Sequence, residues 1–110
     1  MLDHEAAVKC TAKLNEHGYL LSYDDDQKTK ASSYVFAELH AYAAQRLPFG
    51  CDAKKAEQVL KKGLKHVRNN ANRNQQQVEQ AAGVPILLIL GLIPTLYAWI
   101  KMLIDWWRGE

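Results

Sequence analysis

Apolar residues recur with a helical period in three stretches of residues 1–67. Each stretch spaces its apolar positions three or four residues apart, as one face of an amphipathic helix requires. The three apolar faces comprise Leu2, Ala6, Cys10 and Leu14; Val35, Phe36, Leu39, Tyr42, Ala43 and Leu47; and Ala56, Val59, Leu60, Gly63, Leu64 and Val67. The pattern therefore predicts an all-α domain of about three helices.

Capping residues indicate where these helices begin and end. The first helix is expected to end at Gly18, the second to run from Ser32 or Ser33 to the residue before Pro48, and the third to begin at Asp52. Residues 19–30, YLLSYDDDQKTK, have no helical period and are predicted to form a loop, with 19–23 packing as an extended segment. The acidic run 24–26 lacks the spacing of a calcium loop, which favours a solvated loop.

Residues 68–83 form a polar stem or linker, rich in Asn and Gln. Three structures fit this composition: a helix continuing from the third, a flexible linker, or a helix whose Asn and Gln side chains pair with other copies. No Pro or Gly interrupts residues 64–82, and Gln favours helices. We therefore favour a continuous helix.

Residues 84–107 are predicted to form a single transmembrane helix. Val84–Ile104 spans about 31 Å as a helix, close to the roughly 30 Å of a bilayer core. No charged residue occurs between Val84 and Ile100. The competing structures are a buried core helix, an interfacial helix and a re-entrant hairpin kinked at Pro94. The first is disfavoured because three short apolar faces are too few to surround an apolar helix, and the second because the segment lacks a polar face.

Within this segment, two groups of residues are candidates for function. Small residues and the helix-kinking proline predict a helix-association face of Gly91, Pro94, Thr95 and Ala98. Aromatic and basic residues toward the C-terminal end predict a membrane-interface group of Tyr97, Trp99, Lys101, Trp106, Trp107 and Arg108.

Charge is distributed unevenly around a formal net charge of +2. Residues 1–52 contain five basic and eight acidic side chains, whereas residues 53–83 contain seven basic and two acidic ones. The basic residues of the second region are Lys54, Lys55, Lys61, Lys62, Lys65, Arg68 and Arg73. They suit anionic lipid headgroups, or the acidic first half of a neighbouring copy or of the same chain, or they form a solvated helix face. Nucleic acid is disfavoured because residues 53–80 contain no aromatic residue to stack on bases.

The sequence carries no catalytic signature, and no cofactor or metal is expected. Its four His residues lie at separate positions, neither Cys10 nor Cys51 belongs to a CxxC unit, and no phosphate-binding loop or nucleophile elbow occurs. Two cysteines without a leading signal peptide indicate reduced thiols in the cytoplasm.

These features predict a non-enzymatic, tail-anchored protein of the inner membrane with a cytoplasmic N-terminal domain. It is expected to act as a self-associating assembly or adaptor subunit whose partners are the lipid bilayer and copies of itself or a larger membrane complex. The alternative is a pore-forming effector, holin-like or toxic, built from C-terminal helices that associate through Gly91, Pro94 and Thr95.

Overall fold

The computed structural model describes residues 4–47 and 51–109, and these ranges contain six α-helices. They are α1 (His4–Glu16), α2 (Asp25–Ala44), α3 (Ala53–Arg73), α4 (Gln75–Ala82), α5 (Ile86–Ala98) and α6 (Ile100–Arg108). No β-strand occurs in the described ranges, so the predicted all-α class is confirmed. The number of helices is larger than predicted, because the C-terminal third forms three helices.

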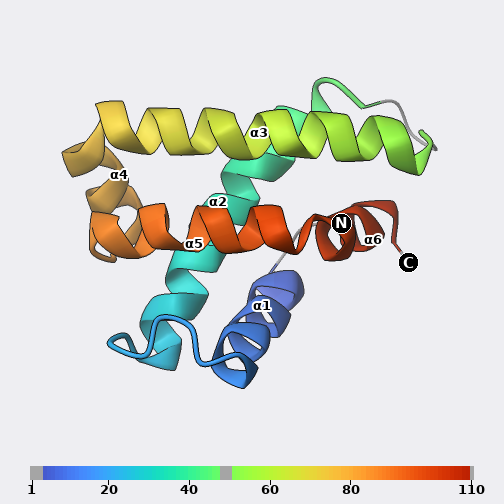
Figure 1. Ribbon diagram of the computed structural model, residues 1–110. Helices are drawn as coiled ribbons and strands as arrows, with labels where there is room; N and C mark the ends of the chain where they lie inside the picture. Colours follow the sequence, from blue (N-terminus) through green and yellow to red (C-terminus); the bar gives the residue numbers. More distant parts are fainter. Residues whose placement is uncertain (1–3, 48–50, 110) are drawn as a thin grey trace.

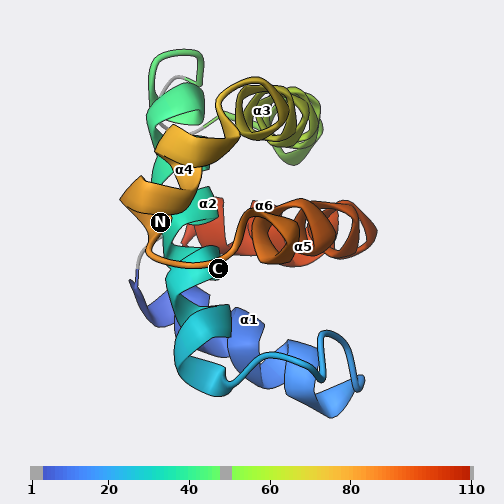
Figure 2. The ribbon, with the colours of Figure 1, turned by 90° about the vertical axis from the view of Figure 1, so that its left-hand side faces the viewer.

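The helices form two layers, seen edge-on in Figure 2. One layer holds α3 and, antiparallel to it, the α5–α6 pair; α2 crosses behind both (Figure 1). α1 packs against α2 near the end of the molecule opposite to α3. The core lies where α2 meets α3 and α5, and its largest fully buried side chains come from these helices, from α1 and from α6.

α1 and α3 follow the sequence pattern closely. Ala6, Cys10 and Leu14 are buried on α1, while Leu2 lies outside the described residues. Gly18 has φ +70°, the left-handed conformation of a residue that ends a helix. At the start of α3, the carboxylate of Asp52 accepts the Lys55 backbone N–H at 2.7 Å, as expected of an N-cap.

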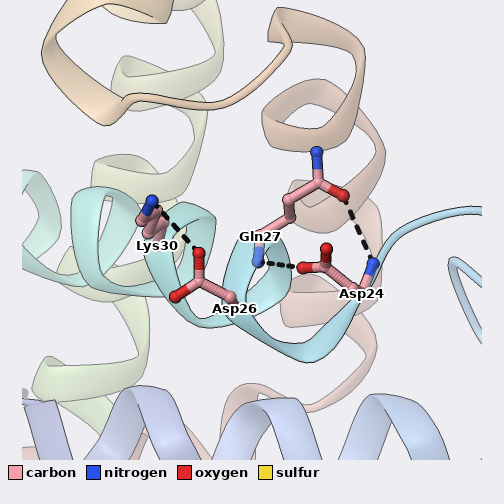
Figure 3. Close-up of polar contacts among 4 residues, drawn as sticks. All are labelled: Asp24, Asp26, Gln27 and Lys30. Atoms are coloured by element: carbon pink, nitrogen blue, oxygen red, sulfur yellow. Dashed lines mark hydrogen bonds and ion pairs between the residues drawn. The ribbon is translucent and has the colours of Figure 1, made fainter.

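α2 begins earlier than predicted, inside the stretch interpreted as a loop. Asp24 is the N-cap: its carboxylate accepts the Gln27 backbone N–H at 2.8 Å, and the Gln27 side chain accepts the Asp24 backbone N–H at 3.3 Å (Figure 3). Asp26 also pairs with Lys30 at 3.1 Å. This reciprocal capping box extends the helix back to residue 25, so Ser32 is a buried interior residue and not a cap.

The polar stem is helical but interrupted. α3 ends at Arg73, Asn74 leaves the helical conformation (φ −124°, ψ 47°), and α4 follows in a new direction. Gly83 then takes φ +73° and ends α4, so the chain returns along α3. The continuous helix that we expected from residues 64–82 is therefore broken at Asn74, and it does not continue in a straight line into the apolar segment.

Residues 84–107 do not form one helix. The break falls at Trp99 (φ −107°, ψ 31°), between α5 and α6. Among the described residues, no single helix is long and apolar enough to cross a membrane; α4 and α5 meet that condition only as a pair, bent by 86°. The inner face of α5 is fully buried, through Leu88, Ile89, Leu92, Ile93 and Leu96.

The apolar segment packs into the protein core because α2 and α3 cover only one side of α5. The sequence disfavours a core helix because three apolar faces are too few to surround an apolar helix. In the structure they do not surround it: α2 and α3 pack on the inner side, and the opposite side of α5 stays at the surface.

Candidate functional site

The outer face of α5 is an exposed apolar surface. It consists of Leu87, Leu90, Gly91, Pro94 and Ala98, which recur at helical spacing on the side opposite to the core. Leu87 is 70% exposed, Leu90 is half-buried, and the other three are exposed. α5 contains no charged residue. A helix that is apolar on both sides and covered on only one is unusual at a protein surface.

Three of the four residues predicted to form a helix-association face belong to this surface. Gly91, Pro94 and Ala98 are exposed on the outer face of α5, whereas Thr95 is half-buried at its edge. A Cβ atom added to Gly91 would lie 3.4 Å from Leu20 Cδ2, an ordinary van der Waals contact. The predicted face is thus accessible and is bordered by the α1–α2 connection.

That connection, residues 17–24, adds further exposed apolar side chains. Leu21 is 79% exposed and Tyr19 is 50% exposed. The connection is fixed to the α5–α6 junction by aromatic contacts: the Trp99 ring lies 5.5 Å from the His17 ring and 6.1 Å, edge-on, from the Tyr19 ring. Sequence reasoning missed this border, although the apolar run 19–23 between charged segments was its signal.

α3 borders the outer face of α5 on the other side. The Tyr97 hydroxyl donates a hydrogen bond to the Lys61 backbone carbonyl at 3.0 Å, which fixes this part of α3 beside α5. Lys54, Lys65 and Arg68 share the side of Lys61 by helical spacing. We call these four residues the basic row; its lysines are exposed and Arg68 is half-buried.

The remaining basic residues predicted on α3 lie elsewhere. Lys55, Lys62 and Arg73 recur at helical spacing on a side of α3 that is turned away from α5, and all three are exposed. The seven predicted basic residues therefore divide into the basic row beside the outer face of α5 and a second set on the far side of the helix.

The aromatic residues predicted for a membrane interface make contacts inside the protein. The Trp106 ring meets Phe36 of α2 edge-on at 5.9 Å, and the Trp107 ring lies 5.0 Å from His40, also on α2. Both tryptophans are half-buried, as are Tyr97 and Trp99, while Lys101 and Arg108 are exposed. The tryptophans of α6 thus fasten this helix to α2.

The titratable groups offer little chemistry. Both cysteines are free thiols, and burial raises the pKa of Cys10 to about 11, an effect that the neighbouring Ser32 hydroxyl offsets only in part. This thiol therefore stays protonated near neutral pH and is a poor nucleophile. Within the described part of the chain, no three His, Cys, Asp or Glu residues are grouped as a metal site would require.

Comparison with protein-family models, with curated proteins and with solved structures finds no match.

Proposed function

We propose that this protein is a non-enzymatic assembly or adaptor module that works at the cytoplasmic surface of the inner membrane and docks there through the outer face of α5. The observation that carries the proposal is the exposure of this uncharged, apolar helix face, with Leu87 at its N-terminal end and Leu21 on the adjoining connection. Apolar helix faces of this kind insert into the boundary between headgroups and acyl chains.

The expected gain from docking is modest and measurable. Fully burying a leucine contributes about 1.5–3 kcal/mol, so Leu87 and Leu21, at 70% and 79% exposed, would each supply about 1–2 kcal/mol on entering the membrane. Because about 1.4 kcal/mol changes an affinity tenfold, losing one of them should weaken binding by about tenfold.

Sedimentation with lipid vesicles tests the proposal. We expect the wild-type protein to pellet with vesicles of mixed phosphatidylcholine and phosphatidylglycerol, and Leu87→Glu to bind at least about tenfold more weakly, since it also places a charge in the interface. Val8→Glu is the matched control, because Val8 is an exposed apolar residue of α1, 47% accessible. Equal binding of Leu87→Glu and Val8→Glu would contradict docking through α5.

Self-association through the same face is a separate outcome of this experiment. A dimer in solution that dissociates on Leu87→Glu, combined with no vesicle binding by the wild-type protein, would assign the outer face of α5 to a second copy. Sedimentation velocity without lipid provides that measurement.

A second candidate is the tail-anchored form, in which residues 84–107 leave the core and cross the bilayer. It is favoured by the apolar character of both the inner and the outer face of α5, which lipid can solvate all round. An alkaline carbonate wash separates the two forms, because it releases a docked protein and retains a crossing one. Release of an entrapped dye from the vesicles would identify the pore-forming version, in which several copies meet along Gly91, Pro94 and Thr95.

A further inference from the structure

We infer that the basic row of α3, Lys54, Lys61, Lys65 and Arg68, binds the anionic headgroups of a bilayer while the outer face of α5 contacts its apolar region. This inference rests on the proposed docking function and adds to it a lipid class and an orientation. The occupant is an anionic lipid surface, chosen for its charge complementarity with the basic row.

The basic row and the apolar face are held side by side by the fold. The hydrogen bond from the Tyr97 hydroxyl to the Lys61 carbonyl joins the two helices at the middle of the row, and α3 packs along both α5 and α6. Within the described residues, Lys61 is the one member of the row with an ion pair, to Glu57 at 2.8 Å, and both of these side chains are about half exposed. The remaining positive charge is available to a ligand.

The opposite end of the molecule carries acidic charge. Asp24, Asp25 and Asp26 are exposed at the start of α2, and α5 lies between them and α3 in both views (Figures 1 and 2). An anionic surface attracts the α3 side and repels this end. The protein should therefore dock with α3 and the outer face of α5 toward the membrane, with Leu21 in contact with it and the carboxylates at the start of α2 turned toward water.

A bilayer explains both parts of the surface better than another polyanion does. A nucleic acid would use the lysines but leaves the apolar face without a role, and residues 53–80 contain no Phe, Tyr or Trp for stacking. The acidic end of a second copy would likewise pair with the row alone. An anionic membrane presents headgroups and acyl chains next to each other, as the row and the outer face of α5 require.

The two sets of basic residues on α3 provide a test that holds net charge constant. Lys54→Gln/Lys61→Gln/Lys65→Gln removes three charges from the basic row, which runs along α6 and α5, and Lys55→Gln/Lys62→Gln/Arg73→Gln removes three from the far side of the same helix. Each basic residue at an anionic surface changes affinity about fivefold, so the first variant should bind phosphatidylglycerol-containing vesicles on the order of a hundredfold more weakly. The far-side variant should lose less than about tenfold.

Vesicles of phosphatidylcholine alone, and a series of salt concentrations, complete the experiment. We expect wild-type binding to weaken without phosphatidylglycerol and with rising salt, because screening shortens the reach of the charges.

Equal losses in the two triple variants, or equal wild-type binding to both lipids, would overturn the headgroup inference. Docking through α5 would remain supported in that case if Leu87→Glu still weakens binding. No binding to any vesicle would refute both. If the wild-type protein sediments without vesicles at low salt and the Lys54→Gln/Lys61→Gln/Lys65→Gln variant does not, the basic row binds the acidic end of a second copy and the headgroup inference is overturned.

Discussion

Replacing Gly63 with alanine perturbs the point where α3 crosses α2. A Cβ atom at this position would lie 2.5 Å from Leu39 Cδ1 and 3.0 Å from Tyr42 Cδ1. Leu39 is fully buried, and the Tyr42 ring is held by the Arg46 guanidinium, 3.7 Å from its centre. Neither side chain can move away freely, so overpacking should cost about 1–3 kcal/mol. Alanine recovers about 0.5–1 kcal/mol of helix propensity, which leaves a net effect between no change and a loss of about 2.5 kcal/mol.

Gly91→Ala is the matched control for this crossing. Gly91 also lies inside a helix, but its added Cβ would meet only Leu20 Cδ2, at 3.4 Å. The propensity gain should therefore remain, and this variant should be about 0.5–1 kcal/mol more stable than the wild type. Thermal unfolding followed by far-UV circular dichroism measures both, since 1 kcal/mol corresponds to about 4–8 °C in a domain of this size class. A Gly63→Ala protein that is stabilised as much as Gly91→Ala would refute the close approach of α2 and α3.

Three further predictions concern the cap, the core and one buried thiol. Asp24→Ala should lower the free energy of unfolding by about 1 kcal/mol in urea titrations, because it removes the α2 cap, whereas Asp24→Asn should retain most of it. Leu92→Ala should cost about 2–5 kcal/mol as a cavity on the inner face of α5, and Leu87→Ala on the outer face less than about 0.5 kcal/mol, in the same assay. Burial raises the pKa of Cys10 from 9.0 to about 11, so the unfolded chain releases this proton first and stability should fall as pH rises from 9.0 toward 11. Cys10→Ala should show a smaller decline over that pH range; an unchanged decline would mean that other groups cause it.

Local signals in the sequence were sufficient to place a helix where its periodicity and its capping residues agreed. The apolar faces of α1 and α3 and the Asp52 cap lie where their spacing predicts. The start of α2 was missed because Asp24–Asp26 was interpreted by its charge alone. The Asp24-x-x-Gln27 spacing of a capping box was present in the sequence and indicates a helix start at this position.

Tertiary structure was less accessible from the sequence, and α5 illustrates why. Apolar length fits a bilayer or a protein core equally well, so 84–107 does not by itself distinguish the two. The deciding features are the break at Trp99, whose ring contacts His17 and Tyr19, and the return of the chain at Gly83, after which α5 packs on α2 and α3. Gly91, Pro94 and Ala98 of the candidate surface were predicted, whereas Leu87 and Leu90 were not. The exposure of the surface and the border formed by the α1–α2 connection follow only from that packing.

Whether α5 stays in the protein core or enters the bilayer depends on the helices that it covers. Its own buried side chains are out of water in either environment. If α5 and α6 left, however, Phe36 of α2 and Leu60 and Leu64 of α3 would lose part of their cover; all three are buried in the same apolar cluster. Fully exposing such side chains costs about 1.5–3 kcal/mol each, so the loss for all three has an upper limit of about 4.5–9 kcal/mol, a large part of the stability of a typical domain at about 5–15 kcal/mol. A crossing form therefore requires another apolar surface, from a second copy or a partner, to cover α2 and α3. Docking through the outer face of α5 keeps this core intact, and for that reason it is the form we favour for the isolated chain.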